Sequence, residues 1–254
     1  MRILHINSYY QTGAFYKNLF DRQAAMGDEI AVYTPVPKGF DPGGRDFGPY
    51  TRLDANHRRL DRLFFPLKQK KMLRGALKYY AGRPFDVIHA HSLLTNGGVA
   101  LGLSPRTGVP FAVAVRDTDV NVLMRRMPFL RPLARKILAA ASRVIFLSES
   151  YRERALSPYL TGAEMDAVRN KSVVLPNGVD ALWLTNRPKP RTAPAGDGVN
   201  LLFVGQLIPR KNLPAAIAAA EALSTRGRAA HLTVVGQAVD PRVAEAARAS
   251  SLVS

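Results

Sequence analysis

Residues 205–212 read GQLIPRKN, between an apolar run at 201–204 and an alanine-rich segment with helical spacing. This order predicts a buried strand, a glycine turn and the start of a helix. Asn212 is placed to cap that helix, and Pro214 falls in its first turn. Backbone N–H groups, the positive helix end, Arg210 and Lys211 would then converge on one point. The turn is therefore a candidate phosphate site, although a plain surface turn with solvated charges has the same pattern.

The composition restricts the classes of partner. Among the 254 residues, 36 Lys and Arg exceed 19 Asp and Glu, which gives a net charge of +17. This excess favours nucleic acid, anionic lipid or phosphorylated substrates, and no zinc-finger or RNA-binding aromatic motif supports nucleic acid. The chain has no cysteine, so disulfides and thiolate sites are excluded. No apolar run approaches the roughly 18 residues of a membrane span, and no signal-peptide core is evident, so we expect a cytoplasmic protein.

Strand patterns alternate with helical ones along the chain, which predicts an α/β fold with a Rossmann-like parallel sheet and helices on both faces. The expected strands lie at 3–6, 30–33, 85–91, 111–115, 144–147 and 173–175. A Gly- and Pro-rich stretch at 35–51 is expected to be irregular. The loop at 8–13 holds one glycine, Gly13, so the dinucleotide fingerprint is absent.

A second α/β unit begins after a linker. Residues 1–185 form the first predicted domain, residues 186–199 a Pro- and Gly-rich linker, and residues 200–254 the start of a second Rossmann-like domain. Roughly 55 residues with two strands cannot cover both faces of a parallel sheet, so we expect this second domain to be incomplete.

Polar side chains follow several expected strands at the edge where open α/β sheets bind ligands. His91 ends the third strand, Arg116, Asp117 and Asp119 follow the fourth, and Ser148 and Glu149 follow the fifth. A salt-bridged loop is the alternative for residues 116–119.

The two histidines at 89 and 91 point to the same side of a strand. They could form a metal pair, but carboxylate ligands are not evident nearby, so a polar strand end facing a cleft is favoured.

The segment Arg52–Lys78 is rich in basic residues, with Leu and Phe interleaved and only Asp54 and Asp61 as acids. Such a segment could lie on an anionic membrane surface, and a second basic region at 125–141 would assist it. The alternative, slightly favoured because Pro66 interrupts the periodicity, is a helix with one face in the core and a solvated basic face.

Several stretches occur in the order seen in family 4 glycosyltransferases of the GT-B fold. They are DVIHAH (86–91), the strand before RDTD (116–119), SRVIFLSES (142–150), VLPNGVD (174–180) and LLFVGQLIPRKN (201–212). The resemblance covers nearly the whole chain, and RDTD with VLPNGVD and Trp183 resembles a bacterial subgroup. It implies two Rossmann-like domains across a cleft, with the acceptor on the first and a nucleotide-sugar on the second. It also implies transfer with retention and no metal or other cofactor.

The resemblance assigns roles to individual residues. The implied donor-binding residues are Gly13, Gly205, Gln206, Arg210 and Lys211. The implied catalytic pair is Arg116 and Asp119, and the implied acceptor-side residues are His91, Asp117, Ser148 and Glu149.

The sequence departs from the family pattern at three places. Gln206 stands where the family has arginine, and Arg116 stands where a histidine is common. Arginine cannot act as a base, so it would bind an anionic or hydroxyl-rich acceptor or orient Asp119. The family's paired-glutamate motif has no counterpart before Ser254, so we expect this chain to lack full turnover.

The predicted function is retaining transfer of a sugar from a nucleotide-sugar donor in polysaccharide biosynthesis. The acceptor would be a sugar, a glycolipid or a polyprenol-linked intermediate on the cytoplasmic face of the plasma membrane. Two alternatives stay open. One is a GT-B sugar-nucleotide epimerase, and the other is a nonenzymatic basic module that binds membrane or nucleic acid.

Overall fold

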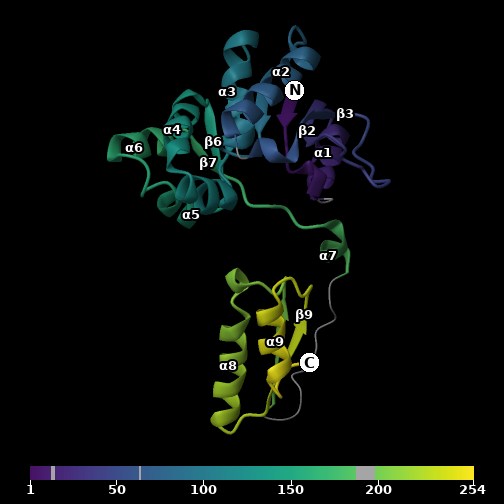
Figure 1. Ribbon diagram of the computed structural model, residues 1–254, viewed down its shortest axis with the longest axis vertical. Helices are drawn as coiled ribbons and strands as arrows, with labels where there is room; N and C mark the ends of the chain where they lie inside the picture. The colour runs from purple at the N-terminus through teal and green to yellow at the C-terminus, as the bar shows by residue number, and fades with distance from the viewer. Residues whose placement is uncertain (13–14, 63, 187–197) are drawn as a thin grey trace. The chain divides into compact units, whose positions relative to one another are not determined.

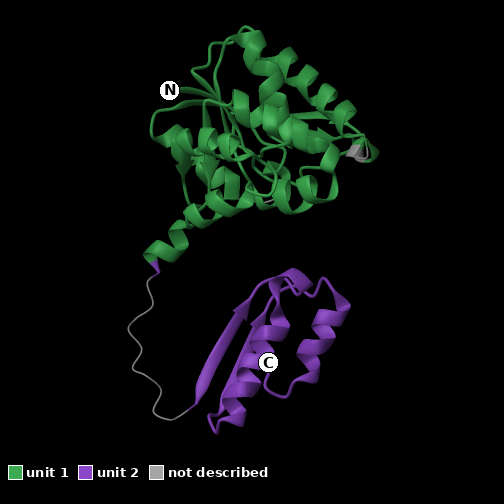
Figure 2. Ribbon diagram, turned by 90° about the vertical axis from the view of Figure 1, so that its left-hand side faces the viewer, with its two compact units in different colours: residues 1–185 green, residues 186–254 purple. Residues whose placement is uncertain are grey.

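The computed structural model describes residues 1–12, 15–62, 64–186 and 198–254, without the side chains of residues 59 and 62. Two compact units make up the chain, Met1–Thr185 and Asn186–Ser254 (Figure 2). No described helix is long and apolar enough to cross a membrane.

A seven-stranded parallel sheet forms the centre of the first unit, in the order β3-β2-β1-β4-β5-β6-β7. Its strands are β1 (Arg2–Ile6), β2 (Glu29–Pro37), β3 (Thr51–His57), β4 (Val87–Ala90), β5 (Phe111–Ala114), β6 (Arg143–Phe146) and β7 (Ser172–Val174). The predicted Rossmann-like α/β fold is confirmed. The strand order reverses between β1 and β4, and open sheets of this kind bind ligands at the carboxyl ends of the strands beside such a point.

Helices cover both faces of this sheet (Figure 1). They are α1 (Phe15–Ala25), α2 (Phe65–Tyr80), α3 (Thr95–Thr107), α4 (Arg131–Ala140), α5 (Glu149–Ala155), α6 (Gly162–Asn170) and the short α7 (Ala181–Thr185). The larger core joins Met72 of α2, Leu103 of α3 and Ile137 of α4 to the sheet. A smaller core on Phe20 of α1 lies against Val32 of β2.

Short helical turns follow several strands at the carboxyl edge. They are the 3₁₀ turns η1 (Tyr10–Thr12), η2 (Arg59–Arg62) and η4 (Pro128–Leu130), and the π-helical η3 (Thr118–Met124). The loop expected at 116–119 is therefore partly helical. Because η3 carries Asp119 and buries Val120 and Met124 in the core, this loop is fixed by packing.

The structure corrects the expected organisation of Arg52–Lys78. Residues 51–57 form the edge strand β3, which pairs with β2, and only the later part of the segment is helical. Charged residues are tolerated in β3 because an edge strand is partly exposed. Pro66 lies in the first turn of α2, where no helical hydrogen bond needs its nitrogen, so it starts the helix and does not interrupt it. The expected irregular stretch also shortens, since β2 continues to Pro37.

The second unit contains the expected strand–turn–helix order. It consists of β8 (Val199–Val204), η5 (Pro209–Lys211), α8 (Leu213–Thr225), β9 (Ala230–Val235) and α9 (Pro241–Ala249), with β8 parallel to β9. Leu213, Ile217 and Leu232 form the centre of its core. Leu202 and Val204 of β8 are exposed, so one face of this two-stranded sheet is uncovered by described residues. Most of the linker predicted at 186–199 lies outside the described residues, and β8 already begins at Val199.

Candidate functional site

A pocket of about 980 Å³ opens at the carboxyl edge of the first unit's sheet. Apolar side chains of β6 and of residues 175–184 form part of its wall, and α1 contributes both apolar and charged side chains. The polar or charged lining comprises Asn18, Asp21, Arg22, Gln23, His89, His91, Arg116, Asn177 and Asp180. Of the predicted site residues, the structure thus brings His91 and Arg116 together. Gly13 lies outside the described residues.

Arg116 spans the ends of three strands. Its Nε donates to the His91 carbonyl at 3.3 Å, and one terminal nitrogen donates to Asn177 Oδ1 at 3.4 Å. The side chain is half-buried, so its charge is held by the loops after β4 and β7 while it faces the pocket. A fixed guanidinium with remaining N–H groups can bind a carboxylate, a phosphate or a pair of hydroxyls.

Asp119 is 0% exposed, and both its oxygens accept backbone N–H groups. The donors are Leu93 at 2.8 Å, Leu94 at 3.0 Å and Arg116 at 3.1 Å. Leu93 and Leu94 precede α3, so the carboxylate supplies negative charge and hydrogen bonds at that helix start. Burial raises the pKa of Asp119 to about 6, against the opposing effect of the N–H donors and Arg116. This geometry supports a positioning role for Asp119 instead of contact with substrate.

The remaining acceptor-side residues are exposed at the same edge but are not part of the pocket lining. The Ser148 hydroxyl accepts the Tyr151 N–H at 3.2 Å and caps α5. Glu149 lies in the first turn of that helix, and Asp117 accepts the Asn121 amide. Ser148 therefore has a structural role that its position before a helix explains.

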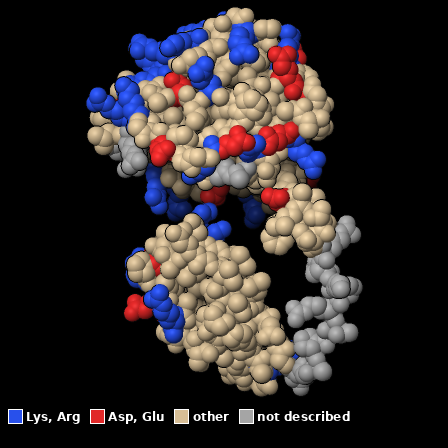
Figure 3. All heavy atoms as spheres, turned by 90° about the vertical axis from the view of Figure 1, so that its right-hand side faces the viewer, with Lys and Arg blue, Asp and Glu red and all other residues tan. Residues whose placement is uncertain are grey.

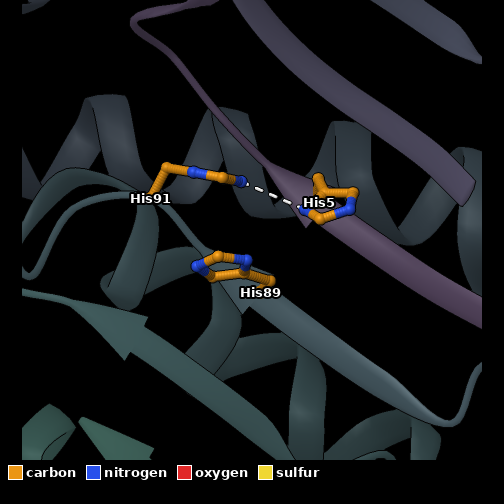
Figure 4. A group of neighbouring side chains, drawn as sticks. All are labelled: His5, His89 and His91. Atoms are coloured by element: carbon orange, nitrogen blue, oxygen red, sulfur yellow. Dashed lines mark hydrogen bonds between the residues drawn. The ribbon is translucent and has the colours of Figure 1, made fainter. Parts of the chain in front are cut away.

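Three histidines, His5, His89 and His91, lie together (Figure 4), and the last two line the pocket. His5 Nδ1 and His91 Nε2 are 3.0 Å apart, and the rings of His89 and His91 stack with centroids at 4.1 Å. His5 lies opposite His89 in the parallel register. Sequence reasoning missed His5, although its same-face position on a neighbouring strand was the available signal.

The arrangement favours a hydrogen-bonded group over the metal pair that the sequence left open. The potential ligand atoms of the three histidines lie within 4.8 Å of one another, but two of them already face each other at hydrogen-bond distance. No described carboxylate joins the group, and the positive charge of Arg116 disfavours added positive charge there. The two buried rings of His5 and His91 instead fill the space under the pocket as neutral groups.

The histidine group makes stability depend on pH. Burial lowers the pKa of His89 to about 4 and holds the pKa of His5 and His91 well below the usual value. An unfolded histidine takes up its proton near pH 6.5, so acid favours the unfolded chain. The stabilisation is complete above about pH 6.5 and is lost progressively as the pH falls toward 4. Asp119 works in the opposite direction between about 6 and 3.8, but it is one group against three.

We therefore expect the urea midpoint of unfolding to fall as the pH is lowered from about 7.5 to about 5. The variant His5→Gln should flatten this dependence. The matched control is His231→Gln, because His231 is exposed in the second unit and should leave the dependence unchanged. Equal pH dependence in wild type and His5→Gln would contradict the assignment.

The turn at 205–212 lies at the carboxyl end of β8. Lys211 ends the 3₁₀ turn just before α8, and Gln206, Arg210 and Lys211 are all exposed there. Asn212 occupies the N-cap position of α8, as expected, but its side chain forms no capping hydrogen bond. Its backbone is in the left-handed region, with φ 54°. Asparagine tolerates this conformation better than most residues.

Gly236 is a further residue of this edge that sequence reasoning missed. A Cβ there would lie 1.8 Å from the carbonyl oxygen of Gly205, so the two loops touch backbone to backbone. The available signal was the triplet Val-Gly-Gln, which follows β8 at 204–206 and β9 at 235–237. Glycine at position 236 is therefore required by the close packing of these two loops.

Solved structures with the same fold place the chain in the GT-B class. The catalytic domain of starch synthase IV from Arabidopsis thaliana, bound to ADP and acarbose, is 13% identical with a TM-score of 0.60, over 97% of this chain and 70% of that one. An E. coli structure named for trehalose-6-phosphate, bound with UDP-2-fluoro glucose, is 11% identical with a TM-score of 0.61, over 96% and 67%. UDP-GlcNAc 2-epimerase from Neisseria meningitidis is 10% identical with a TM-score of 0.55, over 100% and 71%.

Within that class the family is defined by sequence. The chain belongs to the glycosyl transferase 4-like domain family, whose model matches residues 12–178. This confirms the family predicted from the motifs. No curated protein sequence matches the chain.

Proposed function

We propose that this protein transfers a sugar, with retention, from a nucleotide-sugar to a carbohydrate or lipid-linked acceptor. The observation that carries the proposal is Arg116, fixed at the carboxyl edge of a glycosyltransferase-family domain and facing a pocket of about 980 Å³. Structural neighbours are described with UDP or ADP bound, which supports a nucleotide-sugar donor.

The two units would divide the work. Arg116 would meet the acceptor on the first unit. The carbonyl of the buried His91 and the carboxylate of Asp119, which both accept hydrogen bonds from Arg116, would hold it in place. On the second unit, Lys211 and the start of α8 would bind the donor diphosphate, while Gly205 and Gly236 let the two strand ends pack together beside them. Departure of the diphosphate develops negative charge, which preorganised N–H groups and a cation stabilise without need of a metal ion. Arg116 contributes charge and hydrogen bonds and no proton transfer.

Epimerisation of a sugar-nucleotide is the second candidate, because an epimerase is among the structural neighbours. It requires proton transfer by groups whose pKa lies near the working pH. Asp21, His89 and Asp180 are titratable side chains that line the pocket and are at least partly exposed. Burial lowers the pKa of His89 to about 4, and hydrogen bonds from Lys17 and Tyr50 lower the pKa of Asp21, so both pKa values lie far from a neutral working pH. Transfer is therefore the better supported reaction.

Nuclear magnetic resonance on a sugar-labelled UDP-sugar tests both reactions at once. Because full turnover is not expected of this chain, the assay uses high protein concentration. We then expect a slow release of UDP and an acceptor-linked sugar whose anomeric configuration matches that of the donor. A changed sugar still attached to UDP would establish the epimerase instead. If neither product forms and calorimetry detects no UDP or ADP binding, the enzymatic proposal fails.

A further inference from the structure

A second pocket, of about 360 Å³, lies at the amino edge of the first unit's sheet, opposite the edge that holds the candidate acceptor pocket. The starts of β2 and β3 and the end of α2 surround it. Three tyrosines and two arginines are among the lining residues, namely Tyr50, Tyr79, Tyr80, Arg52 and Arg83. No acidic side chain of the described residues lines it, so we name it the arginine pocket.

Both arginines lie against aromatic rings and have no acidic partner. The guanidinium carbon of Arg52 lies 4.8 Å from the ring centroid of Tyr79. That of Arg83 lies 5.7 Å from the centroids of Tyr80 and Phe85. Within the part of the chain that the structure describes, neither guanidinium pairs with a carboxylate or donates a hydrogen bond. Because a ring contacts the face of a guanidinium, the N–H groups at its edge stay free for another acceptor.

The two positive charges meet near the Tyr80 hydroxyl. Burial raises the pKa of Tyr80 to about 12, and the charges of Arg83 and Arg52 oppose that rise because both lie near the hydroxyl. The Tyr80 O–H has no acceptor among the described residues. A neutral O–H donor therefore lies beside two cations whose own donors are unused.

The sheet leaves a backbone donor open at the same place. β3 pairs with β2 only from Val32 onward, opposite Thr51. The Val32 N–H donates to the Tyr50 carbonyl, on the side of β3. Backbone groups of successive residues alternate between the two sides of a strand, so the N–H of Ile30 faces this side as well. Ile30 lies before the start of β3 and lines the arginine pocket, so its N–H adds to the donors there.

The end of α2 opposes an anion here, but only weakly. The carboxyl end of a helix carries about half a negative charge, whereas the two arginines bring two full positive charges. Two carbonyls of the last turn are also occupied: Leu77 accepts from the Ala81 N–H, and Tyr80 accepts from the Arg83 N–H. The net field in the arginine pocket is therefore positive.

Charge alone does not single out this pocket. Figure 3 shows Lys and Arg at several places on one face of the first unit, with acidic side chains in a band across its middle. The arginine pocket differs because two cations with unused donors share one cavity. A neutral sugar would need an open ring to stack on, but Arg52 and Lys78 both lie over the ring of Tyr79, at 4.8 and 5.3 Å. The lining therefore favours an anion.

We propose that the arginine pocket binds the phosphoryl group of a phosphorylated small molecule. Arg52 and Arg83 would each donate two N–H groups to phosphate oxygens, the geometry for which a guanidinium is suited. The Tyr80 O–H and the Ile30 N–H would bind the remaining oxygens. A volume of about 360 Å³ lies within the range of small-molecule sites. Because the two pockets lie at opposite edges of the sheet, this site is separate from the one proposed for transfer and does not rest on that reaction.

Titration of the isotope-labelled whole chain with pyrophosphate, followed by amide magnetic resonance, tests the site. Pyrophosphate carries phosphoryl groups without a base or a sugar. With chloride holding the ionic strength constant, the amide signals of Ile30, Thr51 and Arg83 should shift and reach saturation. Arg52→Gln with Arg83→Gln should weaken this binding about 100-fold, since a hydrogen bond to a charged group contributes about tenfold or more. Tyr80→Phe should weaken it about threefold.

Matched controls separate the arginine pocket from the overall charge and from the turn after β8. Arg106→Gln with Arg143→Gln removes two exposed arginines at the end of α3 and the start of β6, at the same edge of the sheet. It should bind pyrophosphate within about twofold of wild type, since salt screens distant exposed charges. Lys211→Ala should leave the shifts of Ile30 and Thr51 unchanged. Circular dichroism should show that every variant is folded.

Three results would overturn the proposal. They are equal affinity in the Arg52–Arg83 variant and the Arg106–Arg143 control, shifts confined to residues 205–212, and shifts that chloride alone reproduces. Because the chosen amides report on the first unit's amino edge, a negative result there leaves the transfer reaction to be judged by its own assay.

Discussion

Replacing Asp119 by alanine is expected to lower the free energy of unfolding by about 3–5 kcal/mol. The change removes the acceptor of three backbone N–H groups, from Leu93, Leu94 and Arg116, in a place that is closed to water. An unsatisfied buried donor costs about 1–3 kcal/mol, and partial relaxation reduces the sum. A loss of this size is a large part of the stability of an ordinary domain. Urea unfolding followed by circular dichroism measures it.

Two further variants identify the cause. Asp117→Ala removes a neighbouring carboxylate that is exposed, and should cost less than about 1 kcal/mol. Asp119→Asn keeps the shape but turns an N–H₂ group toward N–H donors, so its cost should fall between wild type and Asp119→Ala. If Asp119→Ala is as stable as Asp117→Ala, the carboxylate does not hold the loops.

The sequence was sufficient to predict the fold because its strand segments are continuous apolar runs and because strand and helix patterns alternate along the chain. Runs such as 111–115 and 144–147 are apolar throughout, as parallel strands covered on both faces must be. The edge strand β3 was missed because it has no such apolar run. Its residues are largely polar, TRLDANH, and pairing with β2 on one side alone defines it. That pairing is tertiary and leaves no periodic signal in the chain.

The sequence predicted where the candidate site residues lie better than it predicted what each of them does. Each of His91, Arg116 and Asp119 comes at or just after the end of a predicted strand. This pattern predicted that they share one edge of the sheet, where the structure places them. It could not show that Asp119 faces inward, because three backbone donors from two different loops decide that orientation. His5 and Gly236 were not predicted for a similar reason. Their roles depend on contacts with His91 and Gly205, which lie on neighbouring strands.

Replacing Lys211 by alanine is expected to weaken UDP binding at least about tenfold, the lower end of what a charge-assisted hydrogen bond contributes. Lys211 lies at the end of the turn after β8, next to the start of α8, where the helix dipole already favours an anion. If the chain transfers sugar slowly, the variant should lose more in the rate of the transfer step than in KM, because the diphosphate gains charge as it leaves. Calorimetry with UDP and steady-state kinetics measure the two effects.

The matched control is Arg226→Ala, which removes one exposed cation at the far end of the same helix and should leave UDP affinity unchanged.

Gln206→Arg should be tolerated and should tighten nucleotide binding, since it adds a second cation to the turn. Arg210→Ala tests the neighbouring cation: a large loss places its side chain on the diphosphate, and no loss leaves Lys211 as the main cation. If Lys211→Ala binds UDP as wild type does, the phosphate assignment of residues 205–212 is wrong. The turn after β8 would then lack the cation that a departing diphosphate requires, and the Gly205 N–H could not replace it, because it already donates to the Val235 carbonyl at 3.0 Å.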